Sequence, residues 1–268
     1  MKKNKIKDRR PPALKDEHMP KDFSIALKAY GGGGTTKSLN PNPKKLKYQS
    51  MKGFETEYKN IIDYIVRITY RIWEDKNIGY IYDTYSEDCR VWDEFGLQFG
   101  SEKIVADTVH TNNAFPNIRL FADEVIWAGD EKNSFHTSHR TIITGKNTGY
   151  SKFSPPTGKS VRLLCIANCV AKNNEIYYEN VVYDTVTLIK QLGLNVNEIA
   201  REIANQGNVG PFAPDFKSSK PKRKISKSKN LEFEIPNKIS NIRDFSKAVF
   251  NTIWNRRDFS AIDKVYSD

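Results

Sequence analysis

The sequence contains little from which to build disulfides, metal sites or membrane segments. Its 268 residues include three cysteines, Cys89, Cys165 and Cys169, a sparse and odd-numbered set that gives neither a disulfide framework nor a zinc-ligand spacing. No run of about 18 apolar residues occurs, which excludes a membrane-spanning helix. No apolar stretch follows the charged N-terminus, which excludes a secretory signal peptide. We therefore expect a cytoplasmic protein.

The net charge of +11 comes from two segments that do not look folded. Residues 1–50 hold 13 Lys and Arg against 4 Asp and Glu, and residues 206–240 hold 8 against 3, whereas residues 51–205 hold 17 against 21. Both basic segments are rich in glycine and proline and poor in clustered apolar residues, so they bury too little surface to offset the entropy of ordering. They are interpreted either as solubilising tails and linkers or as weak electrostatic contacts for nucleic acid or another anionic surface.

The segment between them carries helical and strand patterns. Isoleucines at 61, 65, 68 and 72 recur at helical spacing and predict a helix over residues 55–75, followed by a short helix over 77–85. The turn 93–96 between two short apolar runs predicts a hairpin, and Ser101 is a credible N-cap for a helix to about residue 112.

After Pro116 the pattern changes to strands, predicted at residues 118–128, 134–145, 160–172 and 176–183 from their β-branched and aromatic content. Helices over 185–192 and 197–206 follow. Helices on one side of a curved antiparallel or mixed sheet make an α+β domain.

An internal repeat divides the rest of the chain. Shifting residues 61–87 by 181 positions aligns them with 242–268 and gives six identities, among them Ile72-Trp73 with Ile253-Trp254 and Tyr85-Ser86 with Tyr266-Ser267. We therefore expect a basic disordered segment at 1–53, an α+β domain at 54–206, a basic linker at 207–240 and the helical start of a second copy at 241–268. The second copy looks incomplete, which favours a fragment of a longer protein over a lone helical pair.

Segment 54–194 resembles a SnoaL-like polyketide cyclase (ester cyclase) domain of the nuclear transport factor 2-like superfamily. The resemblance rests on Phe115-Pro-Asn-Ile-Arg-Leu120, on Gly129-Asp130, on the turn Pro155-Pro-Thr-Gly-Lys159 and on Asp184 to Gly193, which ends in Gln-Leu-Gly. It implies a cone, in which a bent sheet wraps around helices and a pocket opens at the wide end. It also implies a homodimer that pairs through the open sheet face, and a buried aspartate that closes polyketide rings by acid–base chemistry.

The resemblance places this acid or base at Asp184, where a desolvated carboxylate would have a raised pKa. The alternative is that Asp184 merely caps the helix that starts at Thr185. On a regular strand Asn180 and Tyr178 share its face, and Asn180 stands where the family often has a tryptophan.

Four more residues are candidate pocket groups, each also open to a structural interpretation. His136 and His139 lie three apart on one strand and so project to opposite faces, which makes them a poor metal pair. His136 is the candidate catalytic partner and His139 a candidate ligand contact. Trp92 ends the first strand, where the family often lines its pocket, although such aromatics more often belong to the core. Asn168 is a polar residue in an otherwise apolar strand. The family's histidine before a Thr-Gly pair is missing at Ile143-Thr144-Gly145, which weakens the catalytic interpretation.

Gly31–Gly34 lacks the Lys-Ser/Thr of a phosphate-binding loop, so we expect no cofactor and no metal. Three hypotheses remain open. The chain is an enzyme that acts on a small apolar carbonyl compound, a non-catalytic domain that binds a ligand or a partner, or an adaptor whose basic tails do the binding.

Overall fold

The computed structural model describes residues 24–26, 49–206 and 241–266, and the chain divides into two compact units, Met1–Pro214 and Asp215–Asp268. Most of the predicted basic segments, 1–53 and 207–240, therefore lie outside the described residues. Within the predicted disordered N-terminal segment, Ser24–Ala26 forms a short strand, β1, that the sequence did not predict. No helix in the described ranges has the length and apolar character to cross a bilayer.

The helices of the first unit follow the predicted pattern with small shifts at their ends. Their bounds are α2 Ile61–Trp73, η4 Ile78–Tyr80, α3 Ile81–Thr84, α4 Ser101–Ala114, α5 Thr185–Gln191 and α6 Val196–Gln206. Helix α2 starts later than predicted because the Asn60 side chain accepts a hydrogen bond from the backbone N–H of Asp63 at 2.8 Å and so caps the helix at that point. Helix α4 is preceded by Gly100 rather than capped by Ser101.

The described residues form a mixed, seven-stranded sheet in the order β1-β4-β5-β6-β7-β2-β3. Its other strands are β2 Tyr85–Asp93, β3 Gly96–Phe99, β4 Arg119–Asp130, β5 Ser134–Lys146, β6 Ser160–Lys172 and β7 Glu175–Tyr183. Neighbouring strands are antiparallel except for β2 and β7, which pair in parallel. The predicted α+β class and the predicted hairpin are confirmed.

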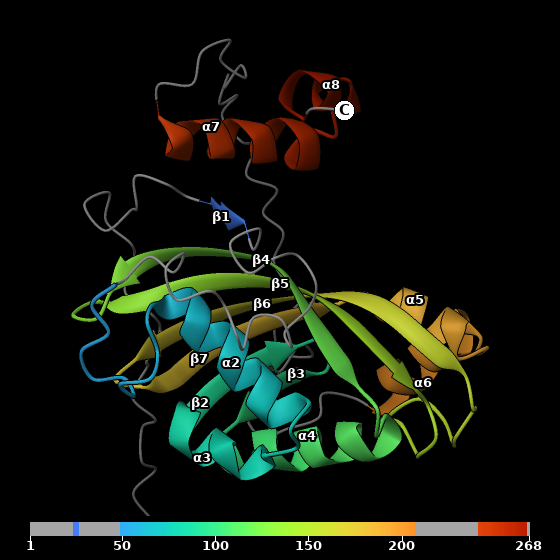
Figure 1. Ribbon diagram of the computed structural model, residues 1–268. Coiled ribbons are helices and arrows are strands. Elements are labelled where there is room, and N and C mark those ends of the chain that lie inside the picture. The colour runs from blue at the N-terminus through green and yellow to red at the C-terminus, as the bar shows by residue number, and fades with distance from the viewer. Residues whose placement is uncertain (1–23, 27–48, 207–240, 267–268) are drawn as a thin grey trace, which may run out of the picture. The chain divides into compact units, whose positions relative to one another are not determined.

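The sheet is strongly bent and covers helices on its concave side. Figure 1 shows it curving over α2, α3 and α4, with α5 and α6 at one end. The register shifts between Ala122 and Glu124 in β4 and between Ile176 and Tyr178 in β7 mark irregularities of the kind that bend strands. The cone expected from the resemblance is therefore the observed architecture of the first unit.

The core lies between the concave side of the sheet and α2, whose residues Ile61, Ile62, Tyr64 and Ile65 are almost fully buried. Along β5 and β6 every second side chain faces this core, as the two-residue period of a strand requires. The burial pattern therefore identifies which face of each strand points into the cone.

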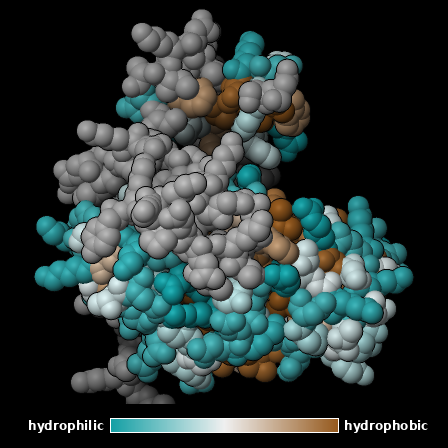
Figure 2. Space-filling view, in the orientation of Figure 1, coloured by the Kyte–Doolittle hydropathy of each residue, from teal (hydrophilic) through white to brown (hydrophobic). Residues whose placement is uncertain are grey.

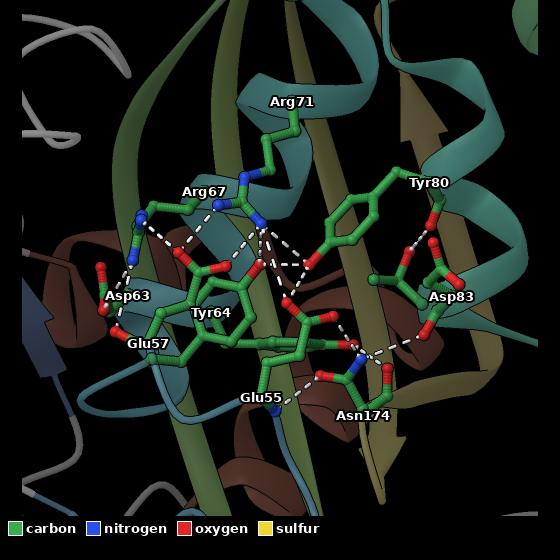
Figure 3. A network of polar contacts seen from close by, with 11 residues as sticks. Glu55, Glu57, Asp63, Tyr64, Arg67, Arg71, Tyr80, Asp83 and Asn174 are labelled. Carbon is green, nitrogen blue, oxygen red and sulfur yellow. Dashed lines mark hydrogen bonds and ion pairs between the residues drawn. The ribbon is translucent and has the colours of Figure 1, made fainter.

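A polar network fastens residues 49–60 to α2 and to the turn between β6 and β7 (Figure 3). Arg67 and Arg71 of α2 each donate a hydrogen bond to Glu57 Oε2, at 2.7 and 2.8 Å. Glu55 Oε2 accepts from the Tyr80 hydroxyl at 2.7 Å, and Glu55 Oε1 accepts from the Asn174 side chain at 3.0 Å. These contacts join three segments that are distant in sequence at one side of the cone.

The second unit is a small helical assembly. It consists of α7 Ile242–Val249, the π-helical η5 Phe250–Asn255, η6 Phe259–Ala261 and α8 Ile262–Val265. Among its described residues the hydrophobic core consists of Val249, Ile253 and Ala261, with Phe245 and Val265 partly buried against them.

A buried asparagine organises the loop between β5 and β6. The Asn147 side chain is fully buried and donates hydrogen bonds to the carbonyls of Ala114 and Gly149, at 3.3 and 2.8 Å. Its oxygen accepts from the backbone N–H and the hydroxyl of Thr157, at 2.8 and 2.9 Å. The loop that carries Ser151–Phe153 is thereby held against the C-terminal end of α4.

Asn147→Ala is expected to lower the free energy of unfolding by about 2–4 kcal/mol, because it leaves several buried backbone groups without a partner. Urea titration followed by circular dichroism measures this change. Asn113→Ala, which truncates an exposed asparagine of α4, is the matched control. A loss at Asn147 no larger than that of the control would show that the side chain does not hold the loop.

Candidate functional site

A cavity of about 220 Å³ lies inside the cone, between the concave side of the sheet and helices α2 and α4. Most of its wall is apolar, with Ile65, Ile68 and Ile72 of α2, Ile104 of α4, and Val181 and Leu188 from the opposite side. Such a space is suited to a small, largely apolar molecule whose orientation is fixed by a few polar groups.

Glu179 of β7 is the carboxyl group placed deep in this wall. Its residue is 8% exposed, and its Oε2 accepts a hydrogen bond from the Tyr85 hydroxyl at 3.1 Å. Burial raises the pKa of Glu179 to about 7, although hydrogen bonds from Tyr85 and the Cys169 thiol act in the opposite direction. A carboxyl group with such a pKa exchanges its proton near neutral pH, as a general acid or base must.

His139 of β5 is another polar group of the wall, among several others. It is 3% exposed, and its Nε2 has no hydrogen-bond partner among the described residues. Burial lowers the pKa of His139 to about 4, so the imidazole is neutral at physiological pH. A buried polar nitrogen without a protein partner in the wall of a cavity is a candidate contact for a ligand.

The strand register sets the distance between these two groups. Glu179 lies opposite Cys169 on β6, and His139 lies opposite Ala167, two residues away on the same strand. With strands ~4.8 Å apart and ~3.3 Å per residue, their Cα atoms are separated by about 12 Å. Ala167 lies beside His139 and Cys169 lies beside Glu179, and all four residues line the same cavity.

Two loops contribute to one end of the cavity. Phe95, in the turn between β2 and β3, lies with its ring 6.0 Å from that of Phe153, in the loop held by Asn147. The Lys152 ammonium lies 4.6 Å from the centre of the Phe95 ring and 3.8 Å from the Asp107 carboxylate. This end therefore combines an aromatic pair with a cation.

The expectation that Asp184 faces the cavity is wrong. Strand β7 ends at Tyr183, which lines the cavity, and Asp184 is exposed at the N-terminus of α5. Its Oδ1 accepts a hydrogen bond from the Thr187 backbone N–H at 3.1 Å, and this contact lowers the pKa of Asp184. The capping interpretation is therefore the one that the structure supports.

The other predicted pocket residues on even positions of β7 lie on the wrong face as well. Because Glu179, Val181 and Tyr183 face inward, Asn180 and Tyr178 project from the convex side of the sheet. Asn168, opposite Asn180, is exposed on that same side. None of these three lines the cavity.

The two histidines separate as their spacing predicts. His139 lies in the cavity wall, whereas His136 is half-buried and does not line the cavity, so its proposed catalytic partnership has no support. Trp92 is likewise half-buried outside the wall. No group of three or more His, Cys, Asp or Glu side chains in the described ranges is placed to hold a metal ion.

Glu179 is the residue that the sequence interpretation missed. The available signal was an acidic residue inside the strand Ile176-Tyr-Tyr-Glu-Asn-Val-Val, whose other inward positions are apolar. Strict alternation starting from Ile176, which faces the core, would place Glu179 on the opposite face. Both residues face the core because a register shift lies between Ile176 and Tyr178. Only pairing with β6 shows that both Ile176 and Glu179 point inward.

The first unit is similar to solved structures of SnoaL-like and ketosteroid isomerase-like proteins. A protein of the SnoaL-like polyketide cyclase type from Jannaschia sp. CCS1 has 16% identity over 55% of this chain and 99% of its own, with a TM-score of 0.46. A SnoaL-like polyketide cyclase from Agrobacterium tumefaciens has 16% identity over 49% and 97%, with a TM-score of 0.41. A protein with a ketosteroid isomerase-like fold from Catenulispora acidiphila, bound to trimethylamine, has 18% identity over 50% and 95%, also with a TM-score of 0.41. No protein-family model and no curated protein matches the chain.

The raised pKa of Glu179 makes stability depend on pH. Between the ordinary glutamate pKa of 4.5 and about 7, the folded state holds a proton that the unfolded state releases, so this group's contribution to stability falls as pH rises. Relative to the wild type, Glu179→Gln is expected to gain roughly 2–3 kcal/mol of unfolding free energy between pH 5 and pH 8. Urea titrations at a series of pH values measure the difference.

His139 contributes in the opposite sense, since its lowered pKa makes stability rise with pH from about 4 to 6.5, but this contribution is common to both proteins and cancels in the difference. Asp184→Asn serves as the control for removing a carboxylate from the exposed surface. A difference between Glu179→Gln and wild type that stays constant with pH would contradict a buried, protonated Glu179.

Proposed function

We propose that the first unit is an acid–base enzyme for a small, largely apolar carbonyl compound, and that Glu179 is the catalytic residue that moves the proton. The proposal rests on one observation: a carboxyl group whose pKa is raised to about 7 lies in the wall of an apolar cavity together with a neutral imidazole that lacks a partner among the described residues. The similarity to SnoaL-like proteins is compatible with this class of reaction but does not assign it.

The geometry supports a redox-neutral reaction in two steps. Glu179, as the carboxylate, takes a proton from the carbon next to the carbonyl group, and the electron pair of the C–H bond becomes the enolate. His139 Nε2–H donates a hydrogen bond to the developing oxyanion, which is stabilising in a cavity of low polarity. The enolate then either regains the proton from Glu179 at another carbon, or its carbon attacks a second carbonyl of the same molecule and the alkoxide so formed takes the proton back from Glu179. Ketosteroid isomerase likewise uses a carboxylate to move a proton next to a carbonyl group.

Tyr85 acts as a positioning residue. Its hydroxyl donates to Glu179 Oε2 and, together with the hydrogen bond from Cys169, fixes the orientation of the carboxyl group in the cavity wall. The tyrosine itself remains protonated, because burial beside this carboxyl group raises the pKa of Tyr85 well above its usual range.

Proton removal from carbon can be tested with 5-nitrobenzisoxazole, a small aromatic compound whose ring opens when a base removes its one acidic C–H proton. The proton passes to the base, the N–O bond breaks, and the phenolate product is followed by its absorbance. We expect catalysis above the buffer rate, with kcat/KM rising through about pH 7, and a loss of about 100-fold or more in Glu179→Gln.

Asp184→Asn is the matched control and is expected to retain a rate within about twofold of wild type, because Asp184 lies outside the cavity. Equal rates in wild type and Glu179→Gln would overturn the catalytic proposal. Saturable binding of the probe, measured by calorimetry, together with such equal rates would favour the alternative of a non-catalytic binding domain.

We also propose that the chain forms a homodimer through the convex side of the sheet. Val182 is 64% exposed there, and it pairs with Ile166, while Leu164, 42% exposed, pairs with Ile142 on β5. These cross-strand neighbours form an apolar strip on the open face, and strips of this kind on soluble proteins are typically interaction surfaces.

Val182→Asp is expected to convert the dimer to a monomer, because a carboxylate at the centre of an apolar interface would have to be desolvated. Size-exclusion chromatography with light scattering should give twice the 30.8 kDa chain mass for wild type and a single chain mass for the variant. Val109→Asp, at an exposed apolar residue of α4, should leave the dimer intact. A monomeric wild type would exclude the assembly.

A further inference from the structure

The second unit repeats the backbone of the helical opening of the first. At an offset of 181 residues, α2 corresponds to α7 together with η5, η4 corresponds to η6, and α3 corresponds to α8. In the last two pairs the first and last residues of the elements correspond without any shift. The caps also agree, since Asn60 and Asn241 both accept hydrogen bonds from backbone N–H groups of the first helical turn.

Backbone strain falls at matching positions as well. Lys76 has a φ of 60° and its counterpart Arg257 a φ of 59°, a left-handed conformation that is uncommon for residues other than glycine. The two segments differ in winding, because Phe250–Asn255 is π-helical where α2 is α-helical. The agreement of caps, turn and helices is therefore a structural repeat, and it extends well beyond the six identical residues.

The apolar side chains that the second unit leaves exposed have counterparts that are half-buried or buried in the first unit. Phe250, Trp254, Phe259 and Tyr266 are 57–64% exposed, and Ile262 is exposed beside them. The hydrophobic colouring at the surface of this unit is visible in Figure 2. Their counterparts Thr69, Trp73, Ile81 and Tyr85 line the cavity of the first unit, and Ile78 packs against its core.

We propose that this face, formed by Phe250, Trp254, Phe259, Ile262 and Tyr266, binds the concave side of a second curved β-sheet and forms with it a second cone. The occupant is a sheet of the kind built by β2 and β4–β7, because that is what covers the counterpart face in the first unit. The concave side of the first sheet already holds α2 and α4.

The expected contact is centred on the C-terminal half of the helix formed by α7 and η5, together with η6 and α8. Ile62, Ile65 and Val66 are buried in the first unit, whereas their counterparts are Arg243, Ser246 and Lys247. Three polar side chains in place of three buried ones reduce the apolar face of the N-terminal half, which keeps Ile242 and Phe245 as the counterparts of Ile61 and Tyr64. The described residues of the second unit form only a small core by themselves, which favours burial of this face against another element.

The test extends the full chain with a second copy of its own sheet: residues 1–267 followed by residues 87–206. Hydrogen exchange is read by mass spectrometry on peptides from 242–266, which are unique to the second unit. We expect amide exchange in these peptides to slow by at least about 100-fold compared with the 1–268 chain, since a packed cone must open before they exchange.

Two variants and one further chain make the outcome decisive. Trp254→Lys with Ile262→Lys should abolish the protection, whereas Asp263→Lys should not, because its counterpart Tyr82 is exposed in the first unit. A chain of residues 1–240 followed by 60–206 tests whether an appended cone with its own helices folds at this place, because peptides from 60–206 then occur twice and give a single protected population only when both copies are folded. If that chain gives a single protected population and the 1–267 extension leaves peptides from 242–266 unprotected, the proposal is overturned.

Discussion

The alternation of side chains along the strands of a bent sheet is the constraint on which the site depends. Most inward positions of β6 are buried on the concave side, whereas most of their neighbours on the convex side are at least partly exposed. One residue along a strand therefore separates a carboxyl group with a strongly raised pKa from an ordinary surface acid. Glu179 is inward and Asp184, beyond the strand end, is outward, and this difference assigns their roles.

Placing a carboxyl group inside an apolar cavity is unfavourable for folding in its ionised form, because desolvation penalises the charge. The same penalty raises the pKa of Glu179 to about 7 and gives it the proton affinity that acid–base chemistry requires. Tyr85 and Cys169 supply hydrogen bonds that only partly offset this penalty. Stability and reactivity at this position therefore have one physical origin and are expected to respond together to pH.

The sequence was sufficient for most of the architecture and insufficient for the site. Periodicity and turn residues located the four long strands to within about two residues, since those strands are rich in β-branched and aromatic residues and bounded by turns. The sequence pattern did not predict β1, a strand of three residues that is defined only by its pairing with β4. The prediction of the site residues failed because the resemblance placed Asp184 in the cavity and the inward face of β7 was then counted from it. Asp184 is not in the strand. The inward face of β7 is set by its pairing with β6 and by the register shift beside Ile176. Neither can be read from the local sequence.

The most direct test of this account is the pKa of Glu179 itself. The carboxyl carbon of Glu179 can be followed by ¹³C NMR during a pH titration of the labelled protein, with its signal assigned from its absence in Glu179→Gln. Desolvation of the carboxyl group predicts a midpoint at about 7. A midpoint near 4.5, the ordinary value for glutamate, would show that water reaches this carboxyl group and would contradict the proposed site.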